Sequence, residues 1–471
     1  MIDLNHLEKY RENNRIEAKK AIGGLPNSIW ETYSAFANTL GGVILLGVEE
    51  LKDKSLHAVD LPDPIYLIEE FWKIINNPKK VSLNILTEKD VQTESVDGKT
   101  IIVIRVPRAE RPDKPIYIDG NPLSGTYRRN GEGDCHCTKD EVQAMLRDAA
   151  SRSQDMLVLE DMDMDVFDYD SIRSYRIRMR HSRPGHVWED LEDEDFLYKI
   201  GAVSRGKDGK RYPTVAGLLM FGHEYEIVKE FPNCFLDYQE HFDDTTRWTD
   251  RIVSSSGDWS GNVFDFYEAV YGRLKPALPD NPVRMAAREA LANCLVNADY
   301  YGEGGVVIIR REDRIVLSNP GDFRIEVAAA KSGGFSDPRN GLLMKMFNLI
   351  DIGDSAGSGI PNIFYTWKQH GWSEPTIKQT VHPNRIEFLL PLMKRGDKVT
   401  RIKQEGKKAE MKSALKRAMI IDYLTDHAEG SFEELTSLLG VKPSNTKKLL
   451  DDLIEEGIVA ITENGMYLLK A

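Results

Sequence analysis

The segment Arg288-Glu289-Ala290-Leu291-Ala292-Asn293 continues through Asn297 to Asp299-Tyr300 and is rich in strong helix formers. It places a carboxylate, Glu289, four residues before a carboxamide, Asn293, so that both lie on one face of a helix. On that face Glu289 can deprotonate or orient a water, and Asn293 can offer an uncharged oxygen to Mg²⁺, which shares its shell with waters and substrate phosphates. The alternative is a solvated surface helix in which the two residues have no joint role.

Two glycine turns follow at spacings suited to a nucleotide pocket. The first closes Asp313-Arg314-Ile315-Val316-Leu317-Ser318-Asn319-Pro320-Gly321, an alternating strand that ends in a turn. The second is Gly357-Ser358-Gly359, which opens a helical pattern through Trp367 to Gly371. Glycines let backbone N–H groups approach phosphates, and the helix start behind them adds its positive end.

Two further segments belong to this half of the chain. Asp337-Pro338-Arg339-Asn340 precedes a helical pattern from Leu342 to Leu349, so Arg339 is a candidate to meet an anionic ligand near a helix start, with Asn340 beside it. Upstream, the unbroken apolar run from Thr214 to His223 predicts a buried strand.

These segments in this order resemble the ATP-binding domain of the GHKL superfamily, in the divergent form of bacterial ATP-binding transcriptional regulators. The resemblance covers about residues 200–395. It implies a general base at Glu289, a magnesium ligand at Asn293, an adenine-side turn at Asn319 and Gly321, and a phosphate lid at Gly357, Ser358 and Gly359.

Two positions depart from that family. Asn297 stands where the divergent form has His, and Asn319 stands where GHKL proteins have an Asp on the adenine amino group. A neutral amide accepts that hydrogen bond more weakly than a carboxylate. The resemblance therefore implies nucleotide binding more strongly than turnover.

A second informative segment lies near the N-terminus. Residues 34–50 read Ser-Ala-Phe-Ala-Asn-Thr-Leu-Gly-Gly-Val-Ile-Leu-Leu-Gly-Val-Glu-Glu, which predicts a helix end, a glycine stop and a buried strand from Val43 to Val48. Thr100 to Val106 predicts another strand. The block closes with a basic tip over Gly125–Gly131 and a helix from about Lys139 to Ala149.

This block, roughly residues 5–150, resembles the AlbA_2 domain of the Schlafen family. Schlafen proteins with RNase activity carry three acidic residues, two before the helix and one just after the Gly-Val strand. Matched by motif, these fall on Glu12, Glu17 and Glu50, with Glu49 the competing choice for the third and Lys19 beside the second. Glu50 replaces the Asp of the family, which lengthens the reach to a metal by one methylene.

Spacing alone does not bring Glu12 and Glu17 together. Two residues five positions apart lie on different faces of a helix and on opposite faces of a strand. Their carboxylates can converge only if the chain bends between them. Clustered carboxylates can hold a divalent metal at a scissile phosphate. The alternative is a set of solvated surface charges. Arg128 and Arg129 suit phosphate contacts, or they form an exposed hairpin tip.

From Lys412 onward the pattern is that of a compact helical unit. Ala414–Leu424 and Asn445–Glu456 predict helices, and the capping box Ser431-Phe432-Glu433-Glu434 opens another between them. Ile458–Ile461 and Met466–Leu469, joined through Asn464-Gly465, predict a hairpin.

Three helices and a hairpin resemble a winged helix-turn-helix domain. Its recognition helix would be the third, with Asn445, Lys447 and Lys448 at the end that can face a major groove. The basic run from Lys394 to Arg417 suits either a phosphate backbone or a solvated tether. Winged helices also serve as dimerisation modules, and the acids from Asp451 to Glu456 would be repelled by phosphate, so a homodimer is the alternative.

The length and the net charge of the chain limit the number of domains and the kind of nucleic-acid contact that can be expected. A chain of 471 residues suggests about three domains, and a net charge of -13 argues against indiscriminate coating of nucleic acid, so any such contact should be local. Acids concentrate in Glu160–Asp170 and Glu189–Asp195 around a basic patch from Arg173 to Arg183. This predicts a charged connector whose charges are solvated or paired with each other.

Cysteines and apolar runs indicate the compartment. Cys135, Cys137, Cys234 and Cys294 lack the paired two-residue gaps of a structural zinc site, so free thiols in a reducing compartment are expected. No secretory leader precedes Tyr10, and the run from Val43 to Val48 is too short to cross a bilayer. We therefore expect a cytoplasmic protein without membrane contact.

The predicted fold class is α+β and multidomain. Its parts are an AlbA_2 mixed α/β domain over 1–150, a charged connector over 151–200, a GHKL-like α/β sandwich with its preceding segment over 201–395, a basic linker over 396–412 and a winged helix-turn-helix over 413–471.

The function predicted from this organisation is that of an ATP- and Mg²⁺-binding regulator of transcription in which nucleotide occupancy modulates the engagement of DNA or RNA. The alternative is a Schlafen-like metal-dependent ribonuclease gated by ATP, acting in stress or phage defence. A third hypothesis is an interaction protein whose nucleotide pocket is vestigial. Hydrolysis and the choice between DNA and RNA stay open at this point.

Overall fold

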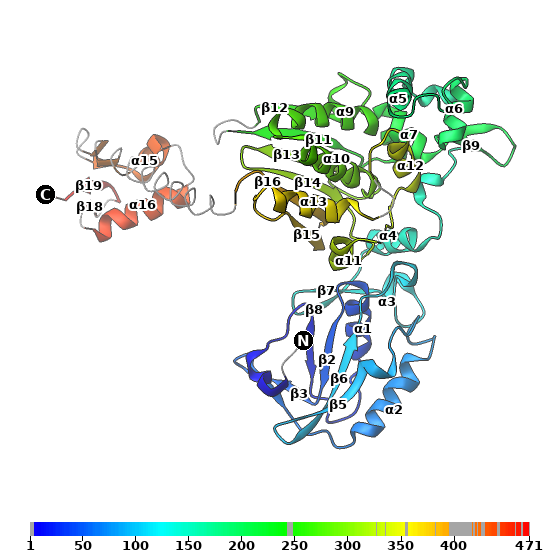
Figure 1. The fold of residues 1–471 in the computed structure, drawn as a ribbon. Coiled ribbons are helices and arrows are strands. Elements are labelled where there is room, and N and C mark those ends of the chain that lie inside the picture. The colour runs from blue at the N-terminus through cyan, green and yellow to red at the C-terminus, as the bar shows by residue number, and fades with distance from the viewer. Residues whose placement is uncertain are drawn as a thin grey trace. The chain divides into compact units, whose positions relative to one another are not determined.

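Two units of unequal size make up the chain (Figure 1). The computed structural model describes residues 4–242, 248–325, 327–334, 336–353, 357–381 and 383–394, and beyond these 417, 420–421, 423–424, 429–439, 443–456, 458–462 and 465–470. Unit 1 comprises Met1–His370 and Glu374–Leu392, and unit 2 comprises Gly371–Ser373 and Met393–Ala471.

The N-terminal domain of unit 1, residues 4–150, is built on a four-stranded sheet in the order β1-β2-β6-β5. β1 (Ile16–Lys19) runs parallel to β2 (Gly42–Leu46), whereas β6 (Lys99–Val106) pairs antiparallel with both β2 and β5 (Val91–Val96). The remaining elements are α1 (Ile29–Asn38), β3 (Val48–Glu50), β4 (Leu56–Ala58), α2 (Pro64–Ile75), α3 (Pro122–Gly125), β7 (Tyr127–Asn130), β8 (Gly133–His136), α4 (Lys139–Ala149) and the short 3-10 helices Leu4–Lys9, Glu88–Asp90 and Arg111–Asp113.

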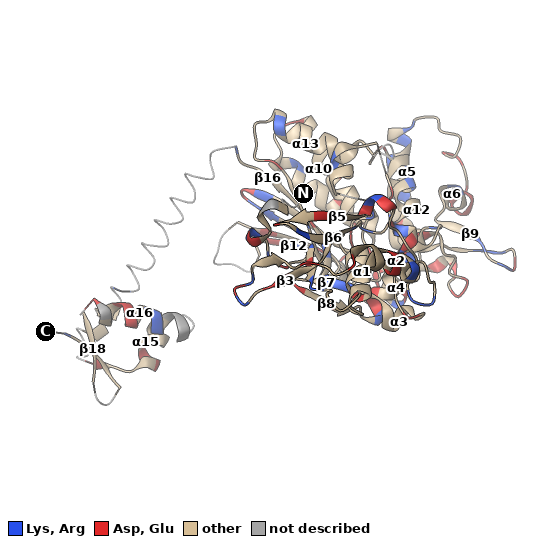
Figure 2. Cartoon of the chain, turned by 90° about the horizontal axis from the view of Figure 1, so that it is seen from below, with Lys and Arg blue, Asp and Glu red and all other residues tan. Residues whose placement is uncertain are grey.

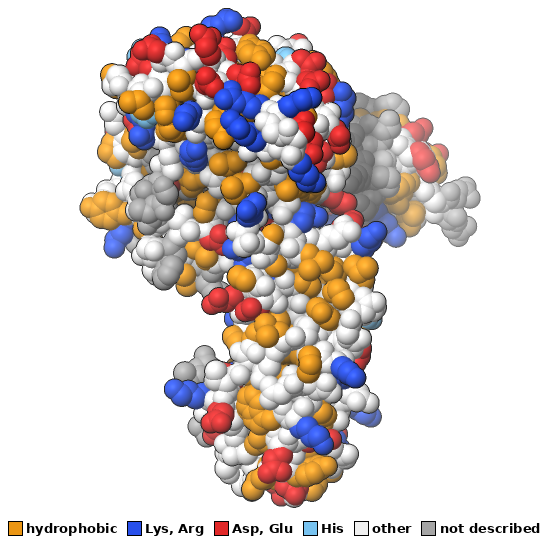
Figure 3. All heavy atoms as spheres, turned by 90° about the vertical axis from the view of Figure 1, so that its right-hand side faces the viewer, with side chains coloured by type: hydrophobic (Ala, Val, Ile, Leu, Met, Phe, Trp, Pro, Cys, Tyr) orange, Lys and Arg blue, Asp and Glu red, His pale blue; other side chains and the backbone are white. Residues whose placement is uncertain are grey.

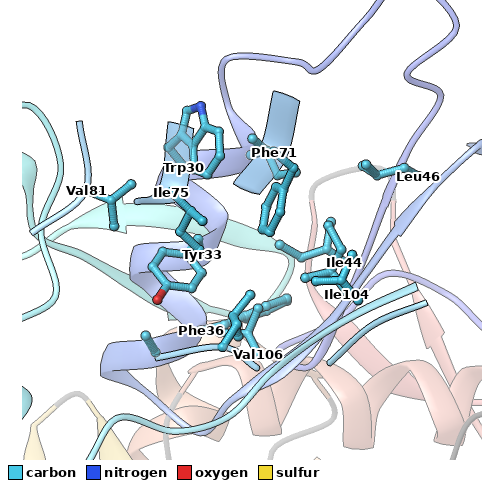
Figure 4. Close-up of a cluster of buried hydrophobic side chains, with 14 of the residues drawn as sticks. Trp30, Tyr33, Phe36, Ile44, Leu46, Phe71, Ile75, Val81, Ile104 and Val106 are labelled. Atoms are coloured by element: carbon cyan, nitrogen blue, oxygen red, sulfur yellow. The ribbon is translucent and has the colours of Figure 1, made fainter. Parts of the chain in front are cut away.

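Both faces of this sheet are buried, which explains the unbroken apolar run of β2. Ile44 and Leu46 pack with Trp30, Tyr33 and Phe36 of α1 and Phe71 of α2, as Figure 4 shows. Leu45, between them, points to a second cluster with Leu7, Val48 and Val103. Alternate side chains of a strand point to opposite faces, so a strand covered on both sides must be apolar throughout. The strand predicted over Val43–Val48 is present as far as Leu46, where Gly47 with a φ of +83° ends it, and Val48 begins the separate strand β3.

The charged connector pairs some of its charges internally. It holds α5 (Tyr169–Ser182), α6 (Asp193–Ile200) and the 3-10 helices Gln154–Met156 and Met164–Val166, and the hairpin β9 (Val203–Arg205) and β10 (Arg211–Pro213) follows it. Arg176 meets Asp193 at 2.5 Å and Arg180 meets Glu189 at 2.5 Å. Figure 2 shows the basic residues along α5, and Figure 3 shows charges of both signs interspersed on the upper part of one face. The predicted internal pairing is thus present for Arg176 and Arg180, whereas Arg178 and Arg183 pair with Glu268 and Asp351 outside the connector.

The segment from Thr214 to His223 is a helix, and the predicted strand is wrong. α7 spans Val215–Phe221, and the Thr214 hydroxyl accepts a hydrogen bond from the Gly217 N–H as an N-cap. Every residue of α7 is buried. A short run that is apolar on all sides carries no periodicity, so strand and helix could not be separated by pattern.

The pocket domain, residues 236–392, contains a six-stranded sheet in the order β12-β11-β13-β14-β16-β15. β11 (Leu236–His241) and β13 (Val306–Arg311) are parallel, and the other neighbours are antiparallel. The other strands are β12 (Asp250–Val253), β14 (Arg314–Pro320), β15 (Thr376–Val381) and β16 (Asn384–Pro391). Register aligns Tyr238, Ile308, Leu317 and Phe388 across four strands on one face.

Helices cover that face. α9 (Val263–Leu274) contacts β11 and β12, α10 (Asn281–Val296) contacts β14 and α13 (Gly359–Gln369), and Phe364 of α13 stacks on Phe388 with ring centres 6.1 Å apart. α8 (Glu224–Glu230), α11 (Val327–Ser332), α12 (Gly341–Leu349) and the 3-10 helices Ser254–Ser256 and Lys275–Ala277 complete the unit. The result is a layer of helices on a layer of sheet, which makes the chain a mixed α/β multidomain protein.

Unit 2 has its own small core. α15 (Phe432–Leu439) and α16 (Pro443–Glu455) accompany a sheet in the order β17-β19-β18, formed by Glu429–Gly430, Tyr467–Leu469 and Val459–Ile461. The capping box is present, since the Ser431 N–H donates to Glu434 Oε2 at 2.8 Å and the Glu434 N–H donates to Ser431 Oγ at 3.2 Å. The predicted hairpin is present as β18 and β19, whereas the basic linker 396–412 and Asn464 lie outside the described residues. None of the helices in the described parts of the chain is long and apolar enough to span a bilayer.

Candidate functional site

A cavity lies on the covered face of the six-stranded sheet, between α10, the end of β14 and the start of α13. It encloses about 930 Å³, including the solvent at its mouth. Leu317, Ile386, Phe388, Met344 and Ile360 supply apolar walls. The polar lining comes from Glu289, Asn293, Asn297, Asn319, Asp322, Arg324 and Asp337. An apolar hollow with a few convergent polar groups is typical of a small-molecule site.

α10 presents Glu289 and Asn293 to this cavity as the four-residue spacing predicts. The Asp280 carboxylate caps the helix by accepting from the Val283 N–H, and Ala290 and Leu291 anchor its buried side. Asn293 Nδ2 donates to Glu289 Oε1 at 3.0 Å. This bond uses an amide hydrogen, so the amide oxygen of Asn293 is the atom that could serve a cation.

Asn297 closes the same helix. Its Nδ2 donates to the Asn293 carbonyl at 2.9 Å, and its Oδ1 accepts from the Arg339 N–H at 3.3 Å. Asn297 thus fixes the end of α10 and also lines the cavity.

The two glycines that begin α13 have different requirements. Gly357 has a φ of +72°, a conformation that favours glycine. A Cβ on Gly359 would lie 2.1 Å from Glu289 Oε1, so the carboxylate packs directly against the helix start. Ser358 occupies the N-cap position without a capping bond from its side chain. Both glycines line the cavity.

Asn319 lies on β14 at the floor of the cavity and is buried. Its Nδ2 donates to the Pro320 carbonyl at 3.1 Å and to the Asn297 carbonyl at 3.4 Å. Both amide hydrogens are therefore directed at backbone carbonyls, which makes Oδ1 the group for a ligand. Gly321 follows with a φ of +99°, and a Cβ there would lie 2.9 Å from Arg339 Nη2.

Arg339 and Asn340 are absent from the cavity lining, in contrast to the sequence expectation. Arg339 is buried, where its guanidinium pairs with Asp148 and donates to the carbonyls of Asn297 and Asp322. Burial lowers the pKa of Arg339, but Asp148, Asp299 and Asp322 together raise it above its usual value. Asn340 Nδ2 donates to the carbonyls of Val296 and Ala298 at 2.9 and 2.8 Å. Both side chains hold the loops behind the pocket.

Sequence reasoning missed the charged rim of the cavity. Asp322, Arg324 and Asp337 line it from two loops. The N-terminal domain reaches the same rim, since Arg108 Nη2 donates to Asp322 Oδ2 at 3.1 Å and Arg111 Nε donates to Asp337 Oδ2 at 2.9 Å. These residues come from three separate loops without periodicity or motif, so no sequence signal linked them.

A second candidate site is the acidic cluster of the N-terminal domain. The chain bends between Glu12 and Glu17, where the Asn13 N–H donates to the Ile16 carbonyl at 3.1 Å. Burial raises the pKa of Glu12, and the neighbouring charges of Glu17 and Glu50 raise it further, while an N–H bond from Ala18 and the charge of Arg129 oppose the shift. The three carboxylates predicted by motif are therefore electrostatic neighbours.

Basic side chains balance much of that charge. Glu17 pairs with Lys19 at 2.9 Å and with Arg129 at 2.7 Å, and Glu50 pairs with Lys54 at 3.3 Å. Glu49 pairs instead with the exposed Lys20 at 2.9 Å. Over the described ranges, no group of three or more His, Cys, Asp or Glu has the geometry to hold a metal ion.

Arg128 and Arg129 do not form an exposed basic tip. The Arg129 side chain is 1% exposed and binds Glu17, Asp134 and the Asn13 carbonyl, while Arg128 pairs with Glu141 at 2.9 Å. The hairpin β7–β8 packs against α1, where the Arg129 guanidinium lies over the Phe36 ring, whereas Arg128 points to the other side of the strand toward Glu141 of α4. On α16 of unit 2, Lys447 and Lys448 are exposed, and the side chain of Asn445 lies outside the described residues.

Comparisons with known proteins follow these divisions. Residues 12–138 match the family described as "Schlafen, AlbA_2", residues 143–237 match "Domain of unknown function (DUF8451)", and residues 304–388 match "Putative ATP-dependent DNA helicase recG C-terminal". No curated protein matches the sequence.

Two solved structures are similar to the chain. The DIP2311 protein from Corynebacterium diphtheriae shares 16% identity over 97% of this chain and 79% of its own, with a TM-score of 0.41. The N-terminal domain of a "Putative ATP-dependent DNA Helicase RecG-related Protein" from Nitrosomonas europaea shares 33% identity over 29% of this chain and 95% of its own, with a TM-score of 0.24.

The chain therefore joins a Schlafen AlbA_2 domain to an ATPase-like domain of the kind described for the recG C-terminus. This confirms the predicted AlbA_2 and ATPase-like architecture. The GHKL assignment and the winged helix stay predictions.

Proposed function

We propose that this protein is an ATP-binding, nucleic-acid-binding regulator in which nucleotide occupancy changes how nucleic acid is engaged. One observation carries the proposal: Glu289, Asn293, Asn319 and the glycines of α13 converge on one cavity, and the N-terminal domain touches its rim. The family matches support it, because an ATPase-like domain and an AlbA_2 domain share the chain.

The residues present fit an adenine nucleotide. Asn319 Oδ1 would accept from the adenine amino group, between walls formed by Leu317, Ile386 and Phe388. The backbone at Gly357 and Gly359 would approach the phosphates at the positive end of α13. A Cβ on Gly359 would have to displace the Glu289 carboxylate, so the glycine keeps that carboxylate close to the start of the helix.

Glu289 and Asn293 would supply the remaining groups. The Asn293 amide oxygen would hold Mg²⁺, which neutralises phosphate charge when bound. Glu289 would orient a water toward the terminal phosphate as a general base. Transcriptional regulation would then require contact with DNA or RNA through the N-terminal domain and through Lys447 and Lys448.

Titration of the full chain with ATP and Mg²⁺ by calorimetry tests the pocket. Asn319→Leu removes the acceptor and should weaken ATP binding about tenfold, the usual value of one buried hydrogen bond. Asn384→Leu, an exposed position on β16 of the same sheet, is the matched control and should bind as the wild type does. Absence of any heat with wild-type protein at millimolar ATP would exclude the nucleotide site.

Filter binding tests the regulatory part of the proposal. Structured RNA, single-stranded RNA and duplex DNA are titrated with the full chain, with and without ATP and Mg²⁺. The affinity for at least one of them should change with nucleotide in wild type and should not change in Asn319→Leu. Equal affinities under both conditions would contradict modulation while leaving nucleotide binding in place.

A second candidate function is a metal-dependent ribonuclease. The electrostatic proximity of Glu12 to Glu17 and Glu50 favours it, although the three carboxylates would have to move closer together to hold a hard divalent metal. It predicts RNA cleavage with Mg²⁺ or Mn²⁺ that Glu17→Ala abolishes. Glu88→Ala removes an exposed carboxylate of the 3-10 helix before β5, and it should leave cleavage unchanged. Wild-type protein that leaves RNA intact with either metal would reject this candidate.

A further inference from the structure

Two domains contribute charged side chains to the rim of the cavity. Asp322 is held by Arg108 at 3.1 Å and by Arg339 at 3.4 Å, and Asp337 is held by Arg111 at 2.9 Å. Arg108 and Arg111 belong to the loop that follows β6 in the N-terminal domain. Two carboxylates that line the cavity are thus neutralised by a domain that contributes no residue to its lining.

Arg324 lines the same rim with incomplete pairing. Its side chain is 8% exposed, Nη1 donates to the Pro338 carbonyl at 2.9 Å and Nη2 donates to the Asp148 carbonyl at 3.2 Å. The buried Nε meets no acceptor among the residues that the structure describes. This nitrogen is enclosed, so a phosphate oxygen would meet it only after the Arg324 side chain moves toward the cavity that the residue lines.

The ion pairs of Arg324 are also the longest at this rim. It lies 3.7 Å from Asp148, which Arg339 contacts more closely, and 3.5 Å from Asp337, which Arg111 contacts at 2.9 Å. Four arginines, 108, 111, 324 and 339, share three aspartates, 148, 322 and 337. This group therefore has one positive charge in excess, beside a cavity wall.

A guanidinium that lines the cavity, in a group with surplus positive charge, suits a phosphate oxygen. Arginine binds phosphate through its planar set of N–H groups, and the bond is strong where water is excluded. Burial lowers the pKa of Arg324, and the charges of Arg339 and Arg111 lower it further, whereas those of Asp148 and Asp337 raise it. An anion at the rim would relieve the repulsion among these cations.

We propose that this rim is the subsite for the phosphate chain of the nucleotide, with Arg324 as the contact residue, and that docking of the N-terminal domain completes it. The inference rests on the proposed nucleotide function and adds a binding residue and a second contributing domain. Without Arg108 and Arg111, Asp322 would keep only the longer pair with Arg339 and Asp337 only the longer pair with Arg324, so both carboxylates would repel the phosphates more strongly. Because binding is reciprocal, a nucleotide that prefers the docked rim also strengthens docking.

Calorimetry with three ligands tests the contact residue in the full chain. Adenosine lacks phosphate, ATP with Mg²⁺ has both parts, and inorganic triphosphate lacks the base. Arg324→Gln should weaken ATP and triphosphate by roughly tenfold to a hundredfold, the range for a hydrogen bond to a charged group, and should leave adenosine unchanged. Arg324→Lys should fall between the two proteins, since it keeps the charge without the planar donor set.

The matched control is Arg314→Gln on β14, a half-exposed arginine outside the cavity lining. It should bind all three ligands as the wild type does. Equal weakening of ATP and adenosine in Arg324→Gln would assign Arg324 a structural role only, and unchanged ATP binding would exclude it from the site. Either result overturns the proposal.

Variants of the N-terminal domain test the second part. Arg111→Gln should weaken ATP and triphosphate by several-fold without touching adenosine, because it leaves the Asp337 carboxylate unpaired by its closest cation. The double variant Arg111→Gln with Asp337→Asn removes both charges and should restore most of the loss. Restoration distinguishes neutralisation of the rim from a general loss of structure.

The outcomes separate this inference from the proposed function. If wild-type protein binds neither ATP nor adenosine but binds triphosphate through Arg324, the nucleotide function fails and the anion subsite stands. If adenosine and ATP bind equally tightly, and triphosphate does not bind, the nucleotide site stands and the subsite is rejected.

Discussion

At the scale of single residues, the most constrained group is Arg339. It is buried behind the pocket, where it joins Asp148 and Asp322 to the carbonyl of Asn297. Removing one member of a buried ion pair leaves an uncompensated charge, which costs more than the pair contributes. Sequence reasoning placed Arg339 near a ligand, but its position at a helix start serves the scaffold.

Arg339→Met should therefore lower the free energy of unfolding by about 3–5 kcal/mol, measured by urea denaturation. The expected loss is this large because Asp148 is buried and depends on Arg339 to balance its charge. Adding Asp148→Asn to the variant should recover part of the loss, because the stranded charge is removed as well. A loss below about 1 kcal/mol would show that other arginines replace Arg339.

The pKa shift of Glu12 gives a prediction with a defined sign. Its pKa is raised in the folded protein, mainly by burial, so the folded state holds the proton more tightly than the unfolded state. Stability from this group falls as the pH rises above the unfolded value near 4.5 and stays reduced above the folded value. Glu12→Gln keeps the oxygen that accepts from the Ala18 N–H and removes the ionisation.

Thermal melts are recorded from about pH 3.5 to about pH 8. Near neutral pH, Glu12→Gln should be more stable than the wild type, and the difference should vanish below about pH 4.5. Glu49→Gln on the adjacent hairpin serves as the control. A difference that persists unchanged into acid would mean that ionisation of Glu12 is not its cause.

Residue-level prediction succeeded where spacing within one element fixes geometry. Glu289 and Asn293 meet at 3.0 Å because four residues make one helical turn. It failed for Arg324, Asp322 and Asp337, which come from loops, and for Arg129, whose burial depends on the packing of β7 and β8 on α1. Such proximities arise from tertiary structure, and no local pattern encodes them.

At the scale of elements, the contact between the start of α13 and α10 defines the pocket. Gly359 is helical, and glycine within a helix is ordinarily less stable than alanine by about 0.5–1 kcal/mol. Its presence here is explained by the Glu289 carboxylate, which occupies the space of a Cβ. The glycine therefore lowers the intrinsic stability of the helix but allows its close contact with Glu289.

Gly359→Ala should weaken ATP binding at least several-fold and should not stabilise the protein. The matched control is Gly272→Ala in α9, which is exposed and has nothing within 4 Å of its added Cβ. That control should raise the free energy of unfolding by about 0.5–1 kcal/mol and leave ATP binding unchanged. If urea denaturation shows the same stabilisation for both substitutions, the Glu289 side chain can move away from the added Cβ without a loss of stability.

Elements with explicit end signals were predicted closely. α4 spans Lys139–Ala149, as expected, and begins at a capping box between Thr138 and Glu141. α7 was mistaken for a strand because its residues are buried on every side. The amphipathic pattern that identifies a surface helix is absent from a helix enclosed by others.

At the scale of the whole molecule, the chain has two units with separate cores. Unit 2 packs around Ile420, Leu435, Leu450 and Leu453, whereas the cavity proposed to bind nucleotide lies entirely within unit 1. A ligand stabilises only the cooperative unit that binds it.

Calorimetric unfolding of the full chain should therefore show two transitions. ATP with Mg²⁺ at about a hundred times its Kd should stabilise unit 1 by about 2.7 kcal/mol, a shift of a few degrees, and leave the smaller transition in place. Asn319→Leu serves as the control that loses the shift. Movement of both transitions together would mean that the two units unfold as one.

The strand order of the pocket domain also has a consequence for synthesis on the ribosome. β16, the last strand of the six, inserts between β14 and β15, so the central ladder stays open until residue 391 has been translated. The N-terminal domain is complete some 240 residues earlier, at the end of α4. Nascent chains should thus carry a folded first domain beside an unpaired β14 edge, and that interval is when a chaperone would matter most.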